Sequence, residues 1–224
     1  MIKTALAATA LAAFTFSAQA VTVVQWDFEA AVAPAASTTW SAIAASLGTG
    51  TASGVHASSS TWSTVAGNGS AKSASANGWA VGDYWQFSFS TLGYSGLAVT
   101  FDETGSNTGP RDFSLQYSTN GVTFSTFASY SLINGGWSAG TPVATTTFSY
   151  DLSAITALNN ASTVTLRLVD GSTTAITGGT VAGTGTSRID NFTVSLTPVP
   201  EASTTAMLAA GLAALGFIAA RRRA

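Results

Sequence analysis

The sequence predicts an all-β fold, an antiparallel β-sandwich that lies between two short apolar ends of the chain. Three observations lead to this prediction. Alternating apolar residues recur along the middle of the chain, turn residues separate the alternating segments, and residues 21–200 contain no sustained apolar face with helical spacing. A sandwich core of about eight to ten strands needs no more than roughly 175 residues.

Several segments show the period of two that is typical of a strand with one buried face. Their apolar sets are Val24, Trp26 and Phe28; Trp85, Phe87 and Phe89; Leu97, Val99 and Phe101; Phe113, Leu115 and Tyr117; Val164, Leu166 and Leu168; and Phe192, Val194 and Leu196. Asn120-Gly121 is the strongest hairpin signal between them. Residues 30–72 carry little periodic signal and predict either two weak strands or a long surface loop.

The N-terminal segment, residues 1–20, has the three parts of a secretory signal peptide. A positive charge near the N-terminus precedes an apolar run at residues 5–16, and the small residues Ala18 and Ala20 close the segment. We therefore expect the export machinery to recognise this segment. Signal peptidase is expected to cleave after Ala20, which makes Val21 the first residue of the mature protein.

The C-terminal segment, residues 198–224, combines a Pro-Glu motif, an apolar stretch and an arginine cluster. Its most apolar part, residues 206–220, gives only about 22 Å of helix, which is shorter than the roughly 30 Å hydrocarbon core of a bilayer. We expect a single transmembrane helix over residues 204–220, with the arginine side chains reaching to the cytoplasmic surface. The arginine cluster consists of Arg221, Arg222 and Arg223.

This arrangement resembles the PEP-CTERM sorting signal, in which a Val-Pro-Glu-Pro-like motif precedes a short hydrophobic helix and a terminal arginine cluster. The motif falls at residues 199–203, where Val199, Pro200 and Glu201 match and Ala202 replaces the second Pro. The resemblance implies a Gram-negative host and a precursor in the inner membrane. It also implies an exosortase that cuts near the motif and passes the protein to the cell surface or to the exopolysaccharide matrix of a biofilm.

The middle of the chain, residues 21–197, also resembles a β-sandwich module that recurs in secreted and PEP-CTERM proteins. The matching motifs are Asn77-Gly78-Trp79, Gly82-Asp83-Tyr84-Trp85-Gln86-Phe87, Gly109-Pro110-Arg111-Asp112-Phe113, Gln116-Tyr117-Ser118-Thr119-Asn120-Gly121 and Ser187-Arg188-Ile189-Asp190-Asn191-Phe192. Such modules look like jelly rolls of the carbohydrate-binding and galactose-binding kind. The resemblance therefore implies a jelly-roll-like ectodomain.

The composition excludes several classes of function. The chain contains no Cys, which removes disulfides, thiolate zinc sites, iron–sulfur clusters and Cys nucleophiles, and its single His excludes multi-His metal sites. Between residues 21 and 200, four basic residues stand against nine acidic ones. A basic surface that binds nucleic acid is therefore not expected.

Few residues are candidates for catalysis. The single His, His56, lies among small residues without a motif around it, so we expect a surface or loop position. Asp102 and Glu103 would point to opposite faces of a strand and are expected to begin a loop rather than form a glycosidase pair. Arg111 and Asp112 are expected to form an ion pair at a strand edge. The chain is therefore predicted not to be an enzyme, with a secreted hydrolase as the remote alternative.

Two kinds of residue are candidates for ligand binding. Glu29 follows the first predicted strand and Asp190 lies in the last one, a pairing that resembles the structural calcium site of jelly-roll carbohydrate-binding modules and implies oxygen ligands for Ca²⁺. Ordinary carboxylates at the rim of the sandwich are the alternative. Four tryptophans outside the alternating sets could stack on sugar rings or close the ends of the sandwich: Trp40, Trp62, Trp79 and Trp137.

The two terminal segments predict an exported, exosortase-sorted and non-catalytic protein of the cell surface or extracellular matrix, associated with exopolysaccharide. As an alternative, the sandwich would be a carbohydrate-binding module that recognises an extracellular polysaccharide through aromatic residues in its loops. A purely structural protein would fill or cross-link the matrix without such a site.

Overall fold

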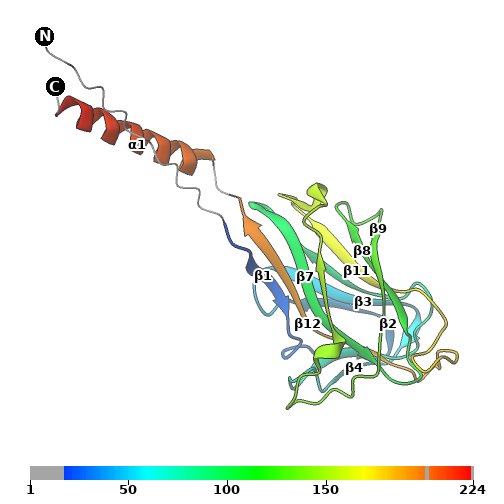
Figure 1. The fold of residues 1–224 in the computed structure, drawn as a ribbon. Helices are drawn as coiled ribbons and strands as arrows, with labels where there is room; N and C mark the ends of the chain where they lie inside the picture. Colours follow the sequence, from blue (N-terminus) through cyan, green and yellow to red (C-terminus); the bar gives the residue numbers. More distant parts are fainter. Residues whose placement is uncertain (1–17, 200–201, 223–224) are drawn as a thin grey trace, which may run out of the picture.

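The computed structural model describes residues 18–199 and 202–222, and it shows two β-sheets packed face to face (Figure 1). All of their strand pairs are antiparallel, so the predicted all-β antiparallel sandwich is confirmed. Most of the predicted signal peptide, residues 1–17, lies outside the described residues. The elements are β1 (Val21–Trp26), β2 (Ser37–Ala44), β3 (Gly50–Ser60), β4 (Trp62–Val65), β5 (Ser73–Ala76), β6 (Tyr84–Phe89), β7 (Tyr94–Gly105), β8 (Asp112–Ser118), β9 (Ser125–Ser131), the 3-10 turn Ala144–Thr146, β10 (Thr147–Asp151), the 3-10 turn Thr156–Leu158, β11 (Val164–Asp170), β12 (Ser187–Pro198) and α1 (Ala202–Arg221).

Strand β12 organises the first sheet, whose order is β10-β7-β12-β5-β4, with β1 also paired to β12. On one side β12 pairs with β7. On its other side the residues 187–189 pair with β5, and the residues 192–196 pair with β1. Val21 lies opposite Leu196, so the beginning of the first strand and the end of the last strand are neighbours.

The second sheet has the order β2-β3-β6-β11-β8-β9. Its strands β8 and β9 form the hairpin that Asn120-Gly121 predicted. The Asn120 side-chain oxygen accepts hydrogen bonds from the N–H groups of Val122 and Thr123, and Gly121 adopts a φ of +70°. A positive φ at this position is the conformation that Gly adopts without steric cost.

Aromatic rings from the two sheets meet at the centre of the sandwich. Phe87 of β6 stacks on Phe192 of β12 with ring centres 3.6 Å apart, and Trp26 of β1 packs edge-on against both rings. These residues belong to the alternating sets of the sequence, and all three are buried. The period of two therefore identified the face of each strand that forms the core.

Residues 30–72 contain β2, β3 and β4, so the structure has more strands than the about eight to ten expected. In β3 the residues that face the core are small apart from His56, and large rings from neighbouring strands cover them, so the sequence of β3 shows no alternating apolar residues. In β3, Gly54 lies directly beneath the rings of Trp62 and Trp85. The space that an apolar side chain would fill on β3 is thus taken by tryptophans from β4 and β6.

The C-terminal helix α1 covers the predicted hydrophobic stretch, residues 204–220, and lies outside the two sheets (Figure 1). Within residues 18–199 and 202–222, no helix meets the length and hydropathy required to cross a membrane. The transmembrane helix therefore stays a prediction.

The packing of β3 predicts that an added methyl group at Gly54 destabilises the domain. A Cβ atom there would lie 2.7 Å from the Trp85 ring and would also overlap Trp62. We expect Gly54→Ala to lower the free energy of unfolding by about 1–3 kcal/mol, measured by urea unfolding of the full chain in detergent. In the control Gly140→Ala, the new Cβ has no atom within 4 Å, and a change within about 0.5 kcal/mol is expected. Equal losses in the two variants would contradict the packing argument.

Candidate functional site

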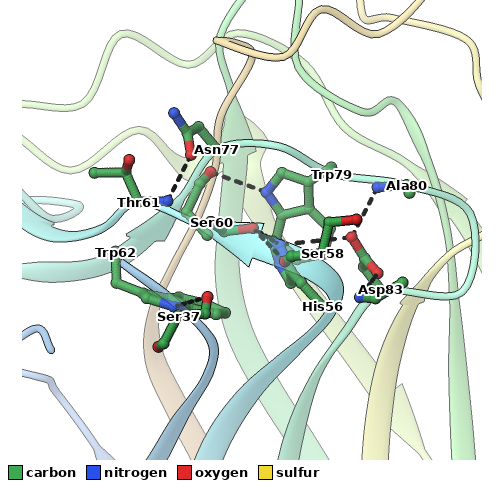
Figure 2. Close-up of polar contacts among 12 residues, drawn as sticks. Ser37, His56, Ser58, Ser60, Thr61, Trp62, Asn77, Trp79, Ala80 and Asp83 are labelled. Atoms are coloured by element: carbon green, nitrogen blue, oxygen red, sulfur yellow. Dashed lines mark hydrogen bonds and ion pairs between the residues drawn. The ribbon is translucent and has the colours of Figure 1, made fainter. Parts of the chain in front are cut away.

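His56 lies on the inner face of β3, next to an acidic residue (Figure 2). Its exposed fraction is only 3%, and its ring lies between those of Trp62 and Trp79, with ring centres 4.7 and 4.4 Å away. The expected surface or loop position is therefore wrong. The small residues around His56 belong to a strand, and tryptophans cover its inward side chains.

The contacts of His56 do not form a catalytic triad. Its Nδ1 atom lies 2.5 Å from Ser60 Oγ and 3.5 Å from Asp83 Oδ2. A Ser-His-Asp triad places the nucleophile and the acid on opposite ring nitrogens, whereas here both partners share Nδ1. The Nε2 atom is buried and has no hydrogen-bond partner among the described residues.

The electrostatic environment of His56 favours the neutral ring. Burial lowers its pKa, and the nearby Asp83 carboxylate opposes this effect only in part. The oxygens of Asp83 also accept hydrogen bonds from the backbone N–H groups of Ala57 and Ala80, both at 2.8 Å. Asp83 thus ties the end of β3 to the loop before β6, and the cluster stabilises the fold.

The four tryptophans that were candidates for sugar stacking are all buried. Three of them donate their indole N–H to the protein: Trp62 to Ser37 O at 3.0 Å, Trp79 to Ala76 O at 2.9 Å and Trp137 to Thr146 Oγ1 at 2.8 Å. None of the four presents a ring face to a ligand, because their exposed fractions are 3%, 4%, 6% and 6% for Trp40, Trp62, Trp79 and Trp137.

Asp102 and Glu103 lie within β7 and do not begin a loop, so that expectation is wrong. They do point to opposite sides, as adjacent strand residues must. Glu103 is buried between the sheets, where Tyr130 Oη and Ser187 Oγ donate to its carboxyl group at 2.6 and 3.0 Å. Asp102 accepts a hydrogen bond from Asn191 Nδ2 at 2.9 Å on the other side. The two carboxyl groups therefore do not face a common groove.

The ion pair expected between Arg111 and Asp112 is present, with Arg111 Nε 2.9 Å from Asp112 Oδ1. Two hydroxyl groups, those of Ser131 and Ser172, also donate to Asp112. These contacts, chiefly the hydrogen bond from Arg111, lower the pKa of Asp112 to about 2. The pair stabilises the start of β8.

Glu29 and Asp190 both contact the loop between β4 and β5. Glu29 Oε1 accepts a hydrogen bond from the Lys72 N–H at 2.9 Å. Asp190 Oδ2 accepts from the Asn68 N–H at 2.9 Å and from Ser70 Oγ at 2.6 Å. The sequence had paired the two carboxylates through the first and last strands, and the structure brings them to the same loop.

The atoms around this loop suit Ca²⁺ in type, since Asp190 Oδ2, Ser70 Oγ and Lys72 O converge beside Gly67, where a Cβ atom would contact all three. Within the described residues, however, no group of three or more His, Asp or Glu side chains could hold a metal ion. A bound Ca²⁺ would need carbonyl and hydroxyl oxygens as well as the two carboxylates. Calcium binding stays a prediction.

The C-terminal segment is the part of the chain that comparison with known proteins identifies. Residues 198–223 match the family model described as the PEP-CTERM protein-sorting motif. This segment is a PEP-CTERM sorting motif. It begins at the last residue of β12, and the next residue, Val199, donates its N–H to Gly93 O at 2.9 Å. Pro200, Glu201 and Arg223 lie outside the described residues, whereas the side chains of Arg221 and Arg222 are exposed.

No curated protein sequence matches the chain. Among solved structures, the K3 cleaved adhesin domain of Lys-gingipain from Porphyromonas gingivalis is 14% identical, covers 78% of this chain and 98% of its own, and gives a TM-score of 0.39. The K2 adhesin domain of Lys-gingipain is 9% identical over 80% of this chain and 98% of its own, with a TM-score of 0.42. The protein TmCBM61 in complex with beta-1,4-galactotriose is 13% identical over 55% of this chain and 70% of its own, with a TM-score of 0.33. Similarities of this size do not indicate what this chain binds.

The buried acids predict that the domain is more stable in mild acid than at weakly alkaline pH. Burial raises the pKa of Glu103 to about 8 and those of Asp170 and Asp190 to about 6. Between its ordinary and its raised pKa, each group is protonated in the folded protein and ionised in the unfolded chain. A rise in pH from about 6.5 to 8 therefore lowers the free energy of unfolding, chiefly through Glu103. Below pH 6.5 the lowered pKa of the buried His56 acts in the opposite direction to these acids. Asp112 has no effect in this window, since its lowered pKa matters only in stronger acid.

This dependence is measured as the Tm of the full chain between pH 6.5 and 8, above the ordinary pKa of His56. We expect Tm to fall as the pH rises through this window, and Glu103→Gln to flatten the decrease. The amide keeps the shape of the side chain but does not titrate. A Tm that rises from pH 6.5 to 8 would show that Glu103 is ionised in the folded protein.

The oxygen atoms around Asp190 predict a calcium response. A ligand that binds only the folded state adds about 2.7 kcal/mol at a hundredfold excess over Kd, and each kcal/mol moves Tm by roughly 2–4 °C in a domain of this size. We expect Tm to rise by several degrees in millimolar Ca²⁺ relative to chelator, and to respond much less to Mg²⁺. The response should weaken below pH 6, where the Asp190 carboxyl group is protonated. Asp190→Asn should abolish it, whereas Asp151→Asn, at an exposed strand end, should keep it. Equal melting curves with Ca²⁺ and with chelator would show that the domain has no calcium site at Asp190.

Proposed function

We propose that the protein is exported, held in the inner membrane as a precursor by its C-terminal segment, and cut by an exosortase near residues 199–203. The mature protein would then lie at the surface of a Gram-negative cell or in its exopolysaccharide matrix. The observation that carries this proposal is the PEP-CTERM sorting motif at residues 198–223. Signal peptidase, the export machinery and the exosortase are the partners that this route requires.

The construction of the domain supports processing at both ends. The first strand begins at Val21 and the last ends at Pro198, so cleavage after Ala20 and a cut within the motif would spare every strand. The exposed residues 18–20 precede β1 directly. The hydrophobic helix that follows the motif would serve as the anchor of the precursor, and the jelly-roll-like winding of the ectodomain is part of the same proposal.

The mature domain is proposed to act without catalysis, through binding or through a structural role in the matrix. Two observations favour a non-catalytic role over a hydrolase. Both partners of His56 share one ring nitrogen, and Glu103 is buried between the sheets. A polysaccharide is the proposed partner, because a polar surface crosses the second sheet around Arg167, which forms no ion pair with any described residue.

Processing is tested by mass spectrometry of the protein isolated from the cell surface. We expect Val21 at the N-terminus and no peptide that contains residues 221–223. The double variant Pro200→Ala, Glu201→Ala should stay in the membrane fraction with its arginine tail intact, because the exosortase no longer recognises the motif.

The matched control is Pro34→Ala, which changes the same residue type in a loop of the domain and should leave processing unchanged. A surface-located protein that keeps its arginine tail would argue for simple membrane anchoring. Normal processing of the double variant would show that the motif is not the recognition element.

A further inference from the structure

A row of polar side chains crosses the outer face of the second sheet. Strand register places Ser53 opposite Gln86, Gln86 opposite Arg167, Arg167 opposite Gln116, and Gln116 opposite Thr126. The residues that alternate with them, such as those flanking Gln86 and Arg167, are buried in the core, so the row faces outward. The row therefore spans β3, β6, β11, β8 and β9 without an apolar residue.

Arg167 stands at the centre of this row in a fixed position. Its guanidinium carbon lies 4.1 Å from the ring centre of Tyr84 and 3.7 Å from that of Phe124, and its Nε donates to Gln86 Oε1 at 2.8 Å. Contacts with two rings and one amide restrict the rotation of the guanidinium group. The side chain thus presents its remaining N–H groups in a defined direction.

The terminal nitrogens of Arg167 have no partner within the described part of the chain. There the ion pairs within 4.0 Å are those of His56 with Asp83 and Arg111 with Asp112, and the hydrogen bond of Arg167 uses only Nε. Partial burial also disfavours the charged form and lowers the pKa of Arg167. A partly desolvated cation that is held rigidly without a counter-ion is preorganised to bind an anion.

We propose that this face binds a polysaccharide that carries carboxylate groups, such as a polymer of uronic acids. The planar fork of Arg167 can donate two parallel hydrogen bonds to one carboxylate, and the amides and hydroxyls of the row can bind the sugar hydroxyls on either side. This inference rests on the proposed function, since it names the class of polysaccharide that the mature protein would meet in the matrix. The row on the second sheet, Ser53, Gln86, Arg167, Gln116 and Thr126, is the binding surface.

A purely structural role is the competing explanation. Arg167 could serve only to cover the rings of Tyr84 and Phe124 and so stabilise the β8–β9 hairpin. Such a role predicts a loss of stability on substitution and no preference for an acidic polymer. The two explanations therefore differ in a binding measurement.

The test is calorimetric titration of the full chain in detergent with oligosaccharides of polygalacturonate and with the same oligosaccharides after methyl esterification. We expect the acidic form to bind about tenfold or more tightly than the ester, because hydrogen bonds to a charged group are the stronger kind. Binding of the acidic form should also weaken as NaCl is raised.

Arg167→Gln should reduce the affinity for the acidic form to that of the ester. The matched control is Arg188→Gln, which removes the same charge from β12 of the other sheet, where the arginine is also partly buried. This variant should leave binding unchanged. If Arg167→Gln fails to fold, the comparison of acid and ester with the unchanged protein decides the question.

Three results would overturn the proposal: no binding of the acidic form, equal binding of acid and ester, or equal competition by inorganic phosphate at the same charge concentration. The last would indicate a general anion site that does not recognise sugar. The proposed sorting is tested separately, since Arg167→Gln should still be exported and processed. If the chain is sorted but does not bind the acidic polymer, this inference is wrong and the proposed sorting is unaffected.

Discussion

The pairing of the first strand with the last is the constraint on which the rest of the structure depends. Strand β12 pairs with β7 along one side, while β5 and then β1 share its other side. The change of partner falls at Asp190 and Asn191, where the register shifts and Asn191 adopts a φ of +50°. The same bend directs the Asp190 carboxylate into the loop before β5, so the strand exchange and the candidate calcium site have one cause.

In the remaining core, small residues of one strand pack against large aromatic rings of neighbouring strands. Gly50 lies against the Trp26 ring and Gly54 against those of Trp62 and Trp85, so β3 contributes only small side chains, such as Ala52, to the apolar core. Aromatic rings carry much apolar area per residue, which lets a chain rich in Ser, Thr and Gly still bury a continuous core. Glu103, which is enclosed with these rings, is stabilised by internal hydrogen bonds from Tyr130 and Ser187.

The predictable part of the fold follows from this packing. Strands such as β6 and β11 carry their own apolar sets, and alternation alone identified them and the faces they bury. Strand β3 could not be recognised, because the neighbouring strands β4 and β6 supply the rings that cover its small residues. His56 was misplaced for the same reason, since its neighbours in sequence are small. The polar row on the second sheet was also beyond prediction: each strand shows polar outward positions, but only the register brings Gln86, Arg167 and Gln116 together.

The sorting motif and the polar row proposed to bind a polysaccharide belong to different sheets. The sorting motif continues from β12 of the first sheet, next to the start of β1. The polar row lies on the outer face of the second sheet, so the whole thickness of the sandwich separates the row from the strand that leads to the motif. Attachment through the C-terminal segment would therefore leave Arg167 uncovered, both in the precursor and after transfer. The proposed attachment at one point and the proposed contact with a polymer at another are compatible in this arrangement, because the two-layer sandwich keeps them on different sheets.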